Sequence, residues 1–383
     1  MKQGFPRWGA LALPSTRWDR SCSCTLGLDA MSAAISGSFQ AAAAPVPLCL
    51  SSTFIQPDNC AFGGWDAANW GSYLGVLKEI GFRQIILHWT WFGGFQFNQI
   101  PAFMQAAESS GLNVIIGLAS MPDNRIYDPA PVTVQAYLNE VAGQSNTLIE
   151  SFTSAGYHTK SFFQGWYISS EVNDVAVASN NGNSRSYNNG RAELWANHYR
   201  SVCLFIKEKC GLPRQNVFTS LYIGQGQHLP PSNMGDFCKL AWQTVRHDVH
   251  FSILIQDARG TYNLADCNPA NCEPGGPSPC SCAIEPYVKA IDGVREAGDG
   301  LGLTLELFGC ATLARVKRQM QLAVKLRTEF REQFNRSLHI SSFCASHHFF
   351  EGGNGYAMEM TRLGRDYENY CQSLGNPSCM SPV

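Results

Sequence analysis

The 383-residue sequence predicts a (β/α)8 barrel, also called a TIM barrel, as a single domain with long loops. Short apolar runs of strand type alternate with longer segments of helical periodicity from residue 46 onward. Eight strands and eight helices can be counted, which is the number that this barrel requires. The first and last strands begin near residues 49 and 338, so the repeat averages about 41 residues and leaves room for long loops.

The predicted strands are nearly continuous apolar runs, which is typical of parallel strands buried on both faces. In chain order they cover residues 49–56, 84–91, 113–119, 162–171, 216–224, 251–257, 303–309 and 338–346. A doubly wound open sheet is the alternative, but it needs fewer or differently spaced units. No G-x-G-x-x-G motif follows the first strand, so the pattern favours the closed barrel.

Each predicted strand is followed by a segment of helical periodicity. These segments cover residues 70–82, 100–112, 132–156, 192–211, 233–245, 285–298, 313–334 and 357–371. Four of them end at a glycine, the residue that most readily adopts the left-handed conformation after a helix. These glycines are Gly81, Gly111, Gly156 and Gly211.

The composition indicates a folded protein and argues against two classes of partner. Hydrophobic residues make up 45% and charged residues 15%, so the chain can fill a large core. There are 28 Lys and Arg against 30 Asp and Glu, with no long run of like charge, so nucleic acid is not a predicted partner. No run of about 18 apolar residues occurs, so membrane insertion is not predicted either.

The 15 cysteines favour disulfide bonds and an oxidising compartment. Several lie close together in polar sequence, four in an insert at about residues 262–284 and two near the C-terminus: Cys267, Cys272, Cys280, Cys282, Cys371 and Cys379. A zinc site is the alternative, but the spacing C-x4-C-x7-C-x-C fits no common zinc motif and contains no His. We therefore predict neither a metal nor a cofactor. Because the count is odd, one thiol at least stays unpaired, and Cys310 and Cys344 in apolar runs are the expected buried free ones.

Residues 1–45 are predicted to precede the fold, and residues 46–383 to form the barrel. The first segment contains four basic residues, two acids and the small-residue stretch AAAAPVP. It fits an export or transit segment cleaved near Ala44, or else an unstructured leader or a start codon chosen too far upstream. The sequon Asn335-Arg336-Ser337 also fits glycosylation. We expect a secreted protein or one in the lumen of the secretory pathway.

The active site of such a barrel lies at the C-terminal ends of its strands, where carboxylates, amides and aromatic side chains gather in this sequence. No strand ends in lysine, which argues against a Schiff-base aldolase, and histidines are too few for a two-metal hydrolase. The residue types fit an oligo- or polysaccharide, because flat aromatic faces stack on sugar rings and amides bind hydroxyl groups. The predicted substrate-binding residues are Gln56, His88, Trp89, Trp91, Asn173, Asp174, Gln256, Asp257 and His347.

Two acids are the candidate catalytic residues, Glu171 after the fourth strand and Glu306 within the seventh. These strands face each other across a barrel of eight, so the two carboxyl groups could flank one glycosidic bond. A separation of about 5 Å leads to retention of configuration. One carboxyl group should then stay protonated near neutral pH while the other is ionised. The alternative is that Glu171 is a surface acid and that Glu306 is a buried acid held by Arg or backbone donors.

Short motifs at these positions resemble a known family. STFIQ, LGVLKEIGFRQIILHWTW, GWYISSEVND, LIQDARG and LELF, from about residue 48 to about residue 350, are similar to a mostly bacterial domain family of unknown function, described as glycoside-hydrolase-like (β/α)8 barrels. The resemblance implies that Glu171 and Glu306 match the acid/base and the nucleophile of the larger clan of retaining glycosidases. Members of that clan carry Asn directly before the acid/base residue, where this chain has Ser170.

Three functions are therefore compared. The first is a retaining glycoside hydrolase, and the second is a carbohydrate-binding barrel that lacks catalysis. The third is a phosphate-binding barrel enzyme that uses the glycine-rich EGGNG at residues 351–355 as an anion nest. The same glycines also fit a simple turn, and the motif contains no Lys or Arg.

Overall fold

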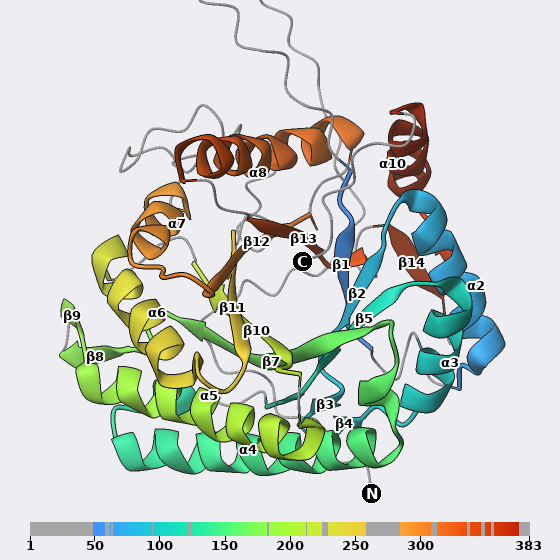
Figure 1. Cartoon of the computed structure of the whole chain (residues 1–383). Coiled ribbons are helices and arrows are strands. Elements are labelled where there is room, and N and C mark those ends of the chain that lie inside the picture. Colours follow the sequence, from blue (N-terminus) through green and yellow to red (C-terminus); the bar gives the residue numbers. More distant parts are fainter. Residues whose placement is uncertain are drawn as a thin grey trace, which may run out of the picture. The chain divides into compact units, whose positions relative to one another are not determined.

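In the computed structural model, eight parallel strands close into a barrel (Figure 1). In chain order they are β1 (Ser52–Ile55), β2 (Gln84–Leu87), β5 (Asn113–Gly117), β7 (Phe163–Asn173), β10 (Asn216–Tyr222), β11 (His250–Gln256), β12 (Gly300–Glu306) and β13 (His339–Phe343). Neighbours in the sequence are neighbours in the barrel, and β13 pairs with β1 to close it. The predicted barrel is confirmed.

The structure describes residues 49–57, 62, 64–93, 95–121, 124–181, 184–211, 213–223, 229–257, 284–307, 312–334, 338–345, 349–353 and 356–374. Several predicted features lie outside these residues. They are the segment 1–45, the cysteine-rich insert, the sequon, Cys310, Cys379 and His347.

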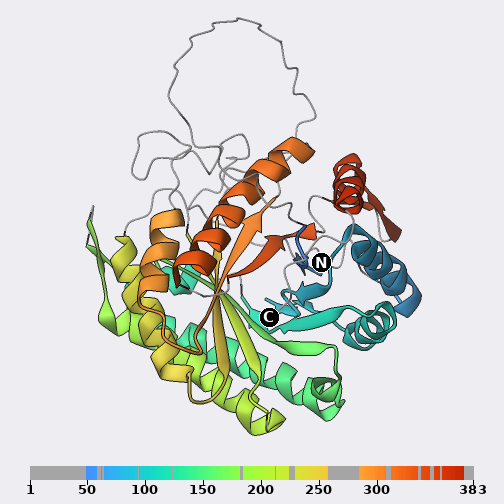
Figure 2. The same cartoon turned by 45° about the horizontal axis from the view of Figure 1, so that its top comes forward.

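Among the described residues, an α-helix follows each barrel strand in the sequence. These helices surround the strands, as Figure 2 shows from a second direction. They are α2 (Ala67–Ile80), α3 (Ile100–Ser110), α4 (Pro131–Ser154), α5 (Asn189–Cys210), α6 (Pro231–Val245), α7 (Ile284–Gly293), α8 (Leu313–Phe334) and α10 (Arg362–Ser373). The sequence determines helix ends locally. Helix α2, for example, begins at Asp66, whose carboxylate accepts from the Ala68 and Asn69 amides, and ends at Gly81, which is left-handed with φ 117°.

Side-chain alternation along each strand separates an inner from an outer layer. On β12, Leu301, Leu303 and Leu305 belong to the large core between strands and helices. The barrel interior holds a separate cluster with about one large residue from most strands: Phe54, Ile86, Ile115, Tyr167, Phe218, Leu254, Phe343 and Cys344. Because side chains alternate, Thr304 and Glu306 face this interior.

One predicted helix is partly wrong. Residues 357–360 do not begin the last helix but belong to strand β15 (Tyr356–Met360), which pairs antiparallel with β14 (Phe350–Gly353). Helix α10 starts after Thr361, whose hydroxyl group accepts from the Gly364 amide. The segment AMEM alternates apolar and polar residues too briefly to distinguish strand from helix, and the hairpin partner decides. Glu351–Gly353 of the glycine-rich segment lie in β14.

A disulfide joins Cys49, just before β1, to Cys371 of α10. Next to it the Leu50 amide donates to Tyr367 Oη at 2.9 Å, so two bonds fasten the last helix to the start of the barrel. Cys344 is buried and forms no disulfide, as predicted, and its thiol donates to the Phe54 backbone oxygen. Among the described residues Cys203, Cys210 and Cys238 also form no disulfide.

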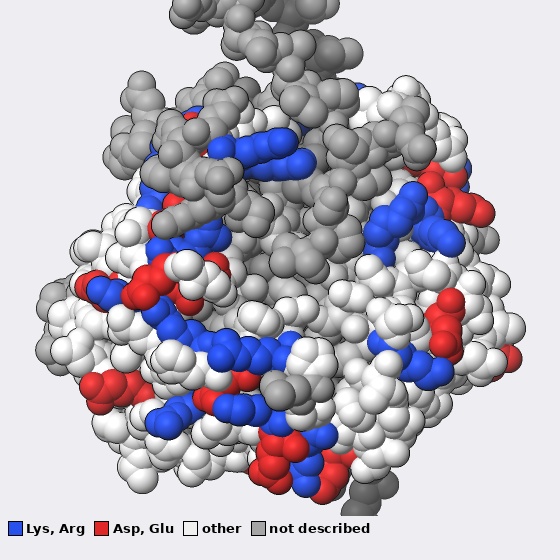
Figure 3. All heavy atoms as spheres, viewed as in Figure 1, with Lys and Arg blue, Asp and Glu red and all other residues white. Residues whose placement is uncertain are grey.

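Charged side chains of both signs are interspersed over the face seen in Figure 3. Several form ion pairs between neighbouring elements, such as Lys207 with Asp248 at 2.7 Å and Lys160 with Glu108 at 3.2 Å. Such exposed pairs contribute at most about 1 kcal/mol each. Within the described ranges, no helix is both long and apolar enough to span a bilayer.

Candidate active site

The fourth barrel strand, β7, is irregular at the candidate acid Glu171. Thr219 of β10 pairs with Ile168, and Leu221 pairs with Val172. Three residues of β7, Ser169 to Glu171, therefore lie opposite the single residue Ser220. A bulge of this kind redirects side chains and is frequent beside active sites.

The Glu171 carboxylate reaches a side chain two strands away. Gln256, the last residue of β11, donates from Nε2 to Glu171 Oε1 at 2.7 Å. On the intervening strand β10, Ser220 lies opposite the bulge that contains Glu171, and Tyr222 pairs with Gln256. Burial raises the pKa of Glu171, while the hydrogen bond from Gln256 acts in the opposite direction. The protonated form of Glu171 therefore persists to higher pH than in an exposed glutamate.

Beneath this pair lies a buried tyrosine. Tyr167 of β7 donates from its hydroxyl group to Ser220 Oγ at 2.6 Å. Its pKa lies well above the usual value, first because of burial and then because of the negative charge of Glu171, whereas hydrogen bonds with Ser220 and Gln256 lower it. Tyr167 is thus a neutral phenol at physiological pH.

The second candidate acid, Glu306, is the last residue of β12 and is buried, with 3% of its surface exposed. Its backbone amide donates to Asp257 Oδ1 at 2.9 Å. Gln256 and Asp257 are adjacent, so one short segment at the end of β11 bonds to both Glu171 and the backbone of Glu306. The two acids consequently share the same mouth of the barrel. Their strands are separated by β10 and β11, so they are three positions apart in the ring of eight and do not face each other directly, contrary to the expectation from the sequence.

Gln56 and His88 lie at the ends of β1 and β2 and contact each other, with Gln56 Nε2 at 3.1 Å from His88 Nδ1. His88 is completely buried, and its ring packs edge-on against Phe54, Tyr167 and Phe343 at centroid distances of 5.7, 5.2 and 5.9 Å. These contacts make His88 part of the aromatic floor below the candidate acids.

Trp89 and Trp91 are both partly exposed. Trp89 has a left-handed backbone with φ 52°, a conformation that costs a bulky residue roughly 1–2 kcal/mol and is often retained at functional sites. Its ring stacks on Phe92 with centroids 4.1 Å apart. Trp91 and Phe92 form β3 (Trp91–Phe92), between β4 (Phe95–Gln96) and β6 (Ala119–Ser120). Sequence reasoning missed Phe92, because an aromatic residue next to Trp91 also fits an ordinary core position.

The side chains of Asn173 and Asp174 form hydrogen bonds with residues of the neighbouring loops. Asn173 Oδ1 accepts from the Ala176 amide at 3.0 Å, and its Nδ2 donates to Tyr127 Oη at 3.2 Å. Asp174 Oδ2 accepts from the Leu229 amide at 3.2 Å. Their predicted role in substrate binding stays a prediction. In the described part of the chain, no three His, Cys, Asp or Glu side chains are grouped as a metal ion would need.

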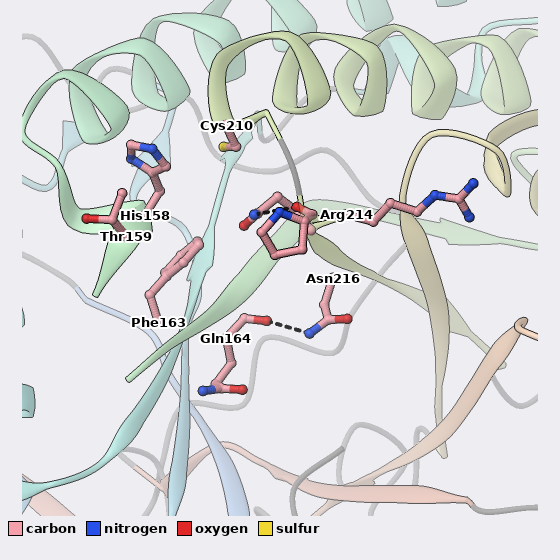
Figure 4. Close-up of a pocket in the computed structure, with 9 residues that line it drawn as sticks. His158, Thr159, Phe163, Gln164, Cys210, Arg214 and Asn216 are labelled. Carbon is pink, nitrogen blue, oxygen red and sulfur yellow. Dashed lines mark hydrogen bonds between the residues drawn. The ribbon is translucent and has the colours of Figure 1, made fainter. Parts of the chain in front are cut away.

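A cavity of about 410 Å³ lies at the other end of the barrel, where β7 and β10 begin (Figure 4). Its lining includes Phe163, Gln164 and Asn216, and Asn216 Nδ2 donates to the Gln164 backbone oxygen at 3.0 Å. Cys210 also lines it, and burial raises the pKa of this thiol to about 11, so it is not a reactive thiolate. Because catalytic groups in these barrels lie at the C-terminal strand ends, the candidate active site remains at the opposite mouth.

Comparison with known proteins agrees with this architecture. The sequence model of a protein family, described as a domain of unknown function (DUF4434), matches residues 50–190. The match confirms the resemblance over these residues, which contain three of the five motifs, whereas LIQDARG and LELF lie outside them. No curated protein matches the sequence.

Solved structures with the same fold include glycosidases. One is a proposed alpha-L-fucosidase from Bacteroides thetaiotaomicron, 15% identical with a TM-score of 0.55, where the match covers 88% of this chain and 98% of the other. Another is a beta-galactosidase from Marinomonas, 10% identical with a TM-score of 0.50, covering 85% and 59%. At these identities the similarity shows only the fold, a (β/α)8 barrel.

Proposed function

We propose that the protein is a glycoside hydrolase that cleaves an oligo- or polysaccharide with retention of configuration. Glu171 is the proposed acid/base and Glu306 the proposed nucleophile. The observation that carries this proposal is the shared support of the two acids by Gln256 and Asp257, which are adjacent at the end of β11. A mechanism with two carboxyl groups requires both to lie at the same end of the barrel, where they can flank one glycosidic bond.

The raised pKa of Glu171 suits the acid role. In the first step its proton goes to the glycosidic oxygen as that bond breaks, while the Glu306 carboxylate bonds to the anomeric carbon. In the second step the Glu171 carboxylate takes a proton from the attacking water, and the bond to Glu306 breaks. The released sugar keeps its original configuration, and both carboxyl groups return to their starting protonation states.

The substrate-binding residues proposed from the sequence divide by chemistry. Trp89 and Trp91, with Phe92 added, offer aromatic faces for a sugar ring. Amide, imidazole and carboxylate groups at the strand ends would bind its hydroxyl groups: Gln56, His88, Asn173, Asp174, Gln256, Asp257 and His347. Among these, Gln56 and His88 contact each other from neighbouring strands, and because His88 is completely buried, we propose that it orients Gln56 rather than reaching the sugar itself.

A carbohydrate-binding barrel without catalysis is the second candidate, and Ser170 favours it. This residue is 1% exposed, and its hydroxyl group has no hydrogen-bond partner among the described residues. Because serine has no side-chain amide, Ser170 cannot donate one to a substrate hydroxyl group, as the Asn at this position in retaining glycosidases is expected to do. The phosphate-binding alternative has no comparable support.

We further propose that the protein is secreted or enters the lumen of the secretory pathway. The Cys49–Cys371 disulfide supports this, because such bonds persist in oxidising compartments.

The test uses purified protein, aryl glycosides of common sugars and a panel of natural glycans. Glu306→Gln should abolish turnover of any substrate found, by roughly 10⁴-fold or more, with an unchanged circular dichroism spectrum. Glu171→Gln should impair substrates with poor leaving groups far more than aryl glycosides, because good leaving groups need less protonation. Full activity of Glu306→Gln would refute the assignment, and glycan binding without turnover would favour the second candidate.

A further inference from the structure

We infer that Gln256 is the residue that positions the Glu171 carboxyl group, and that Tyr167 and Ser220 hold the Gln256 amide in place. The inference rests on the proposed function and adds to it a hydrogen-bond chain inside the barrel. The chain runs from Ser220 of β10 to Tyr167 of β7, to Gln256 of β11 and back to Glu171 of β7.

The donors along this chain have one consistent order. In the structure Gln256 Nε2 donates to Glu171 Oε1 at 2.7 Å, and the ionised form of Glu171, which only accepts hydrogen bonds, requires this amide orientation. The Tyr167 hydroxyl hydrogen is directed to Ser220 Oγ, 2.6 Å away. The lone pairs of Tyr167 Oη are then available to the second N–H of Gln256, whose hydrogen bond lowers the pKa of Tyr167. Reversing the Gln256 amide would remove the donor from the ionised Glu171 carboxylate.

Burial makes the chain rigid. Tyr167, Ser220 and Gln256 are at most 2% exposed. The Tyr167 ring is held edge-on by Phe54 and His88, each with a centroid distance of 5.2 Å. A fixed ring fixes the position of Oη, and thereby the amide that bonds to it.

The arrangement decides which carboxylate oxygen carries the proton. Because Glu171 Oε1 accepts from Gln256, the acidic proton belongs on Oε2. Loss of the Gln256 donor would remove a hydrogen bond to the charged form and raise the pKa of Glu171. Glu171 reaches across β10 from the bulge at Ser169 to Glu171, which lies opposite the small Ser220.

The experiment measures the Glu171 pKa directly, by ¹³C NMR titration of protein labelled at the glutamate carboxyl carbon. The signal is assigned from its absence in Glu171→Gln. We expect Gln256→Met to raise the pKa of Glu171 by about one unit, as loss of a charge-assisted hydrogen bond does, and Tyr167→Phe to raise it by less. Gln256→Asn, which keeps an amide but shortens its reach, should behave like Gln256→Met and serves if the latter does not fold.

Gln84→Met is the matched control, because Gln84 is equally buried but begins β2 at the opposite end of the barrel. It should leave the Glu171 pKa unchanged. An unchanged Glu171 pKa in both Gln256 variants would overturn the inference.

With an active substrate, the alkaline limb of the kcat profile should move to higher pH in Gln256→Asn, an effect that a merely structural role would not produce. If the alkaline limb of the kcat profile stays at the same pH in Gln256→Asn, the positioning role is overturned, while the hydrolase proposal stays intact. A shifted NMR pKa in a protein that hydrolyses no glycan would uphold the contact and count against the proposed function.

Discussion

Removing the Cys49–Cys371 disulfide is expected to destabilise the barrel strongly, because this bond joins residues 322 positions apart. The chain-entropy relation for a loop of that length gives about 6 kcal/mol at 25 °C, which is a ceiling, since measured values are usually about 2–4 kcal/mol. We expect Cys49→Ala/Cys371→Ala to lose about 3 kcal/mol of unfolding free energy. The hydrogen bond from the Leu50 amide to Tyr367 remains in this variant and limits the loss.

Urea unfolding followed by tryptophan fluorescence measures this effect, with the wild-type protein under non-reducing conditions as the reference. Cys210→Ala is the control, because Cys210 is partly buried and forms no disulfide, and it should change the free energy by less than about 1 kcal/mol. If the double variant unfolded at the same urea concentration as the wild type, the account of how α10 is fastened would be refuted. Reduction of the wild type should reproduce the loss.

Two further predictions concern pH and sugar binding. Burial lowers the pKa of His198 to about 4, below the value of about 6.5 expected in the unfolded chain. The contribution of neutral His198 to the unfolding free energy is therefore fully present above about pH 6.5. It is lost, by up to about 3 kcal/mol, as the pH falls towards 4. In His198→Leu, the unfolding free energy measured with urea should depend less on pH between about 4 and 6.5. An unchanged pH dependence would contradict the lowered pKa of His198. Trp89→Ala should raise KM for a glycan by about 10-fold with a smaller effect on kcat, and an unchanged KM would remove Trp89 from the proposed sugar platform.

The barrel could be predicted from the sequence because both of its signals are local. Apolar runs such as residues 113–119 specify buried parallel strands, and glycines such as Gly81 and Gly111 mark helix ends. Glu306 could be singled out for the same reason, since an acid within an apolar strand is costly unless it has a role. Where the pattern was short, as in AMEM at residues 357–360, the antiparallel partner β14 decided the outcome.

The contacts of the site could not be predicted, because they join residues far apart in the sequence. The hydrogen bond from Gln256 to Glu171 joins residues 85 positions apart, and Glu171 lies in a bulge of β7 that the sequence pattern does not reveal. Asn173 and Asp174 matched a sugar-binding pattern, yet their side chains contact Tyr127 and the Leu229 amide, as only the loop geometry reveals. The pairing of Cys49 with Cys371 likewise follows from where the last helix packs, since a count of cysteines leaves the connectivity open.

The measurement that tests the central claim most directly is the anomeric configuration of the sugar first released, followed by ¹H NMR during hydrolysis of a cleaved glycoside. Attack by Glu306 with proton transfer by Glu171 predicts that the released sugar has the configuration of the substrate, and that Glu306→Gln releases none. Release of the opposite anomer, or unimpaired release by Glu306→Gln, would contradict the account.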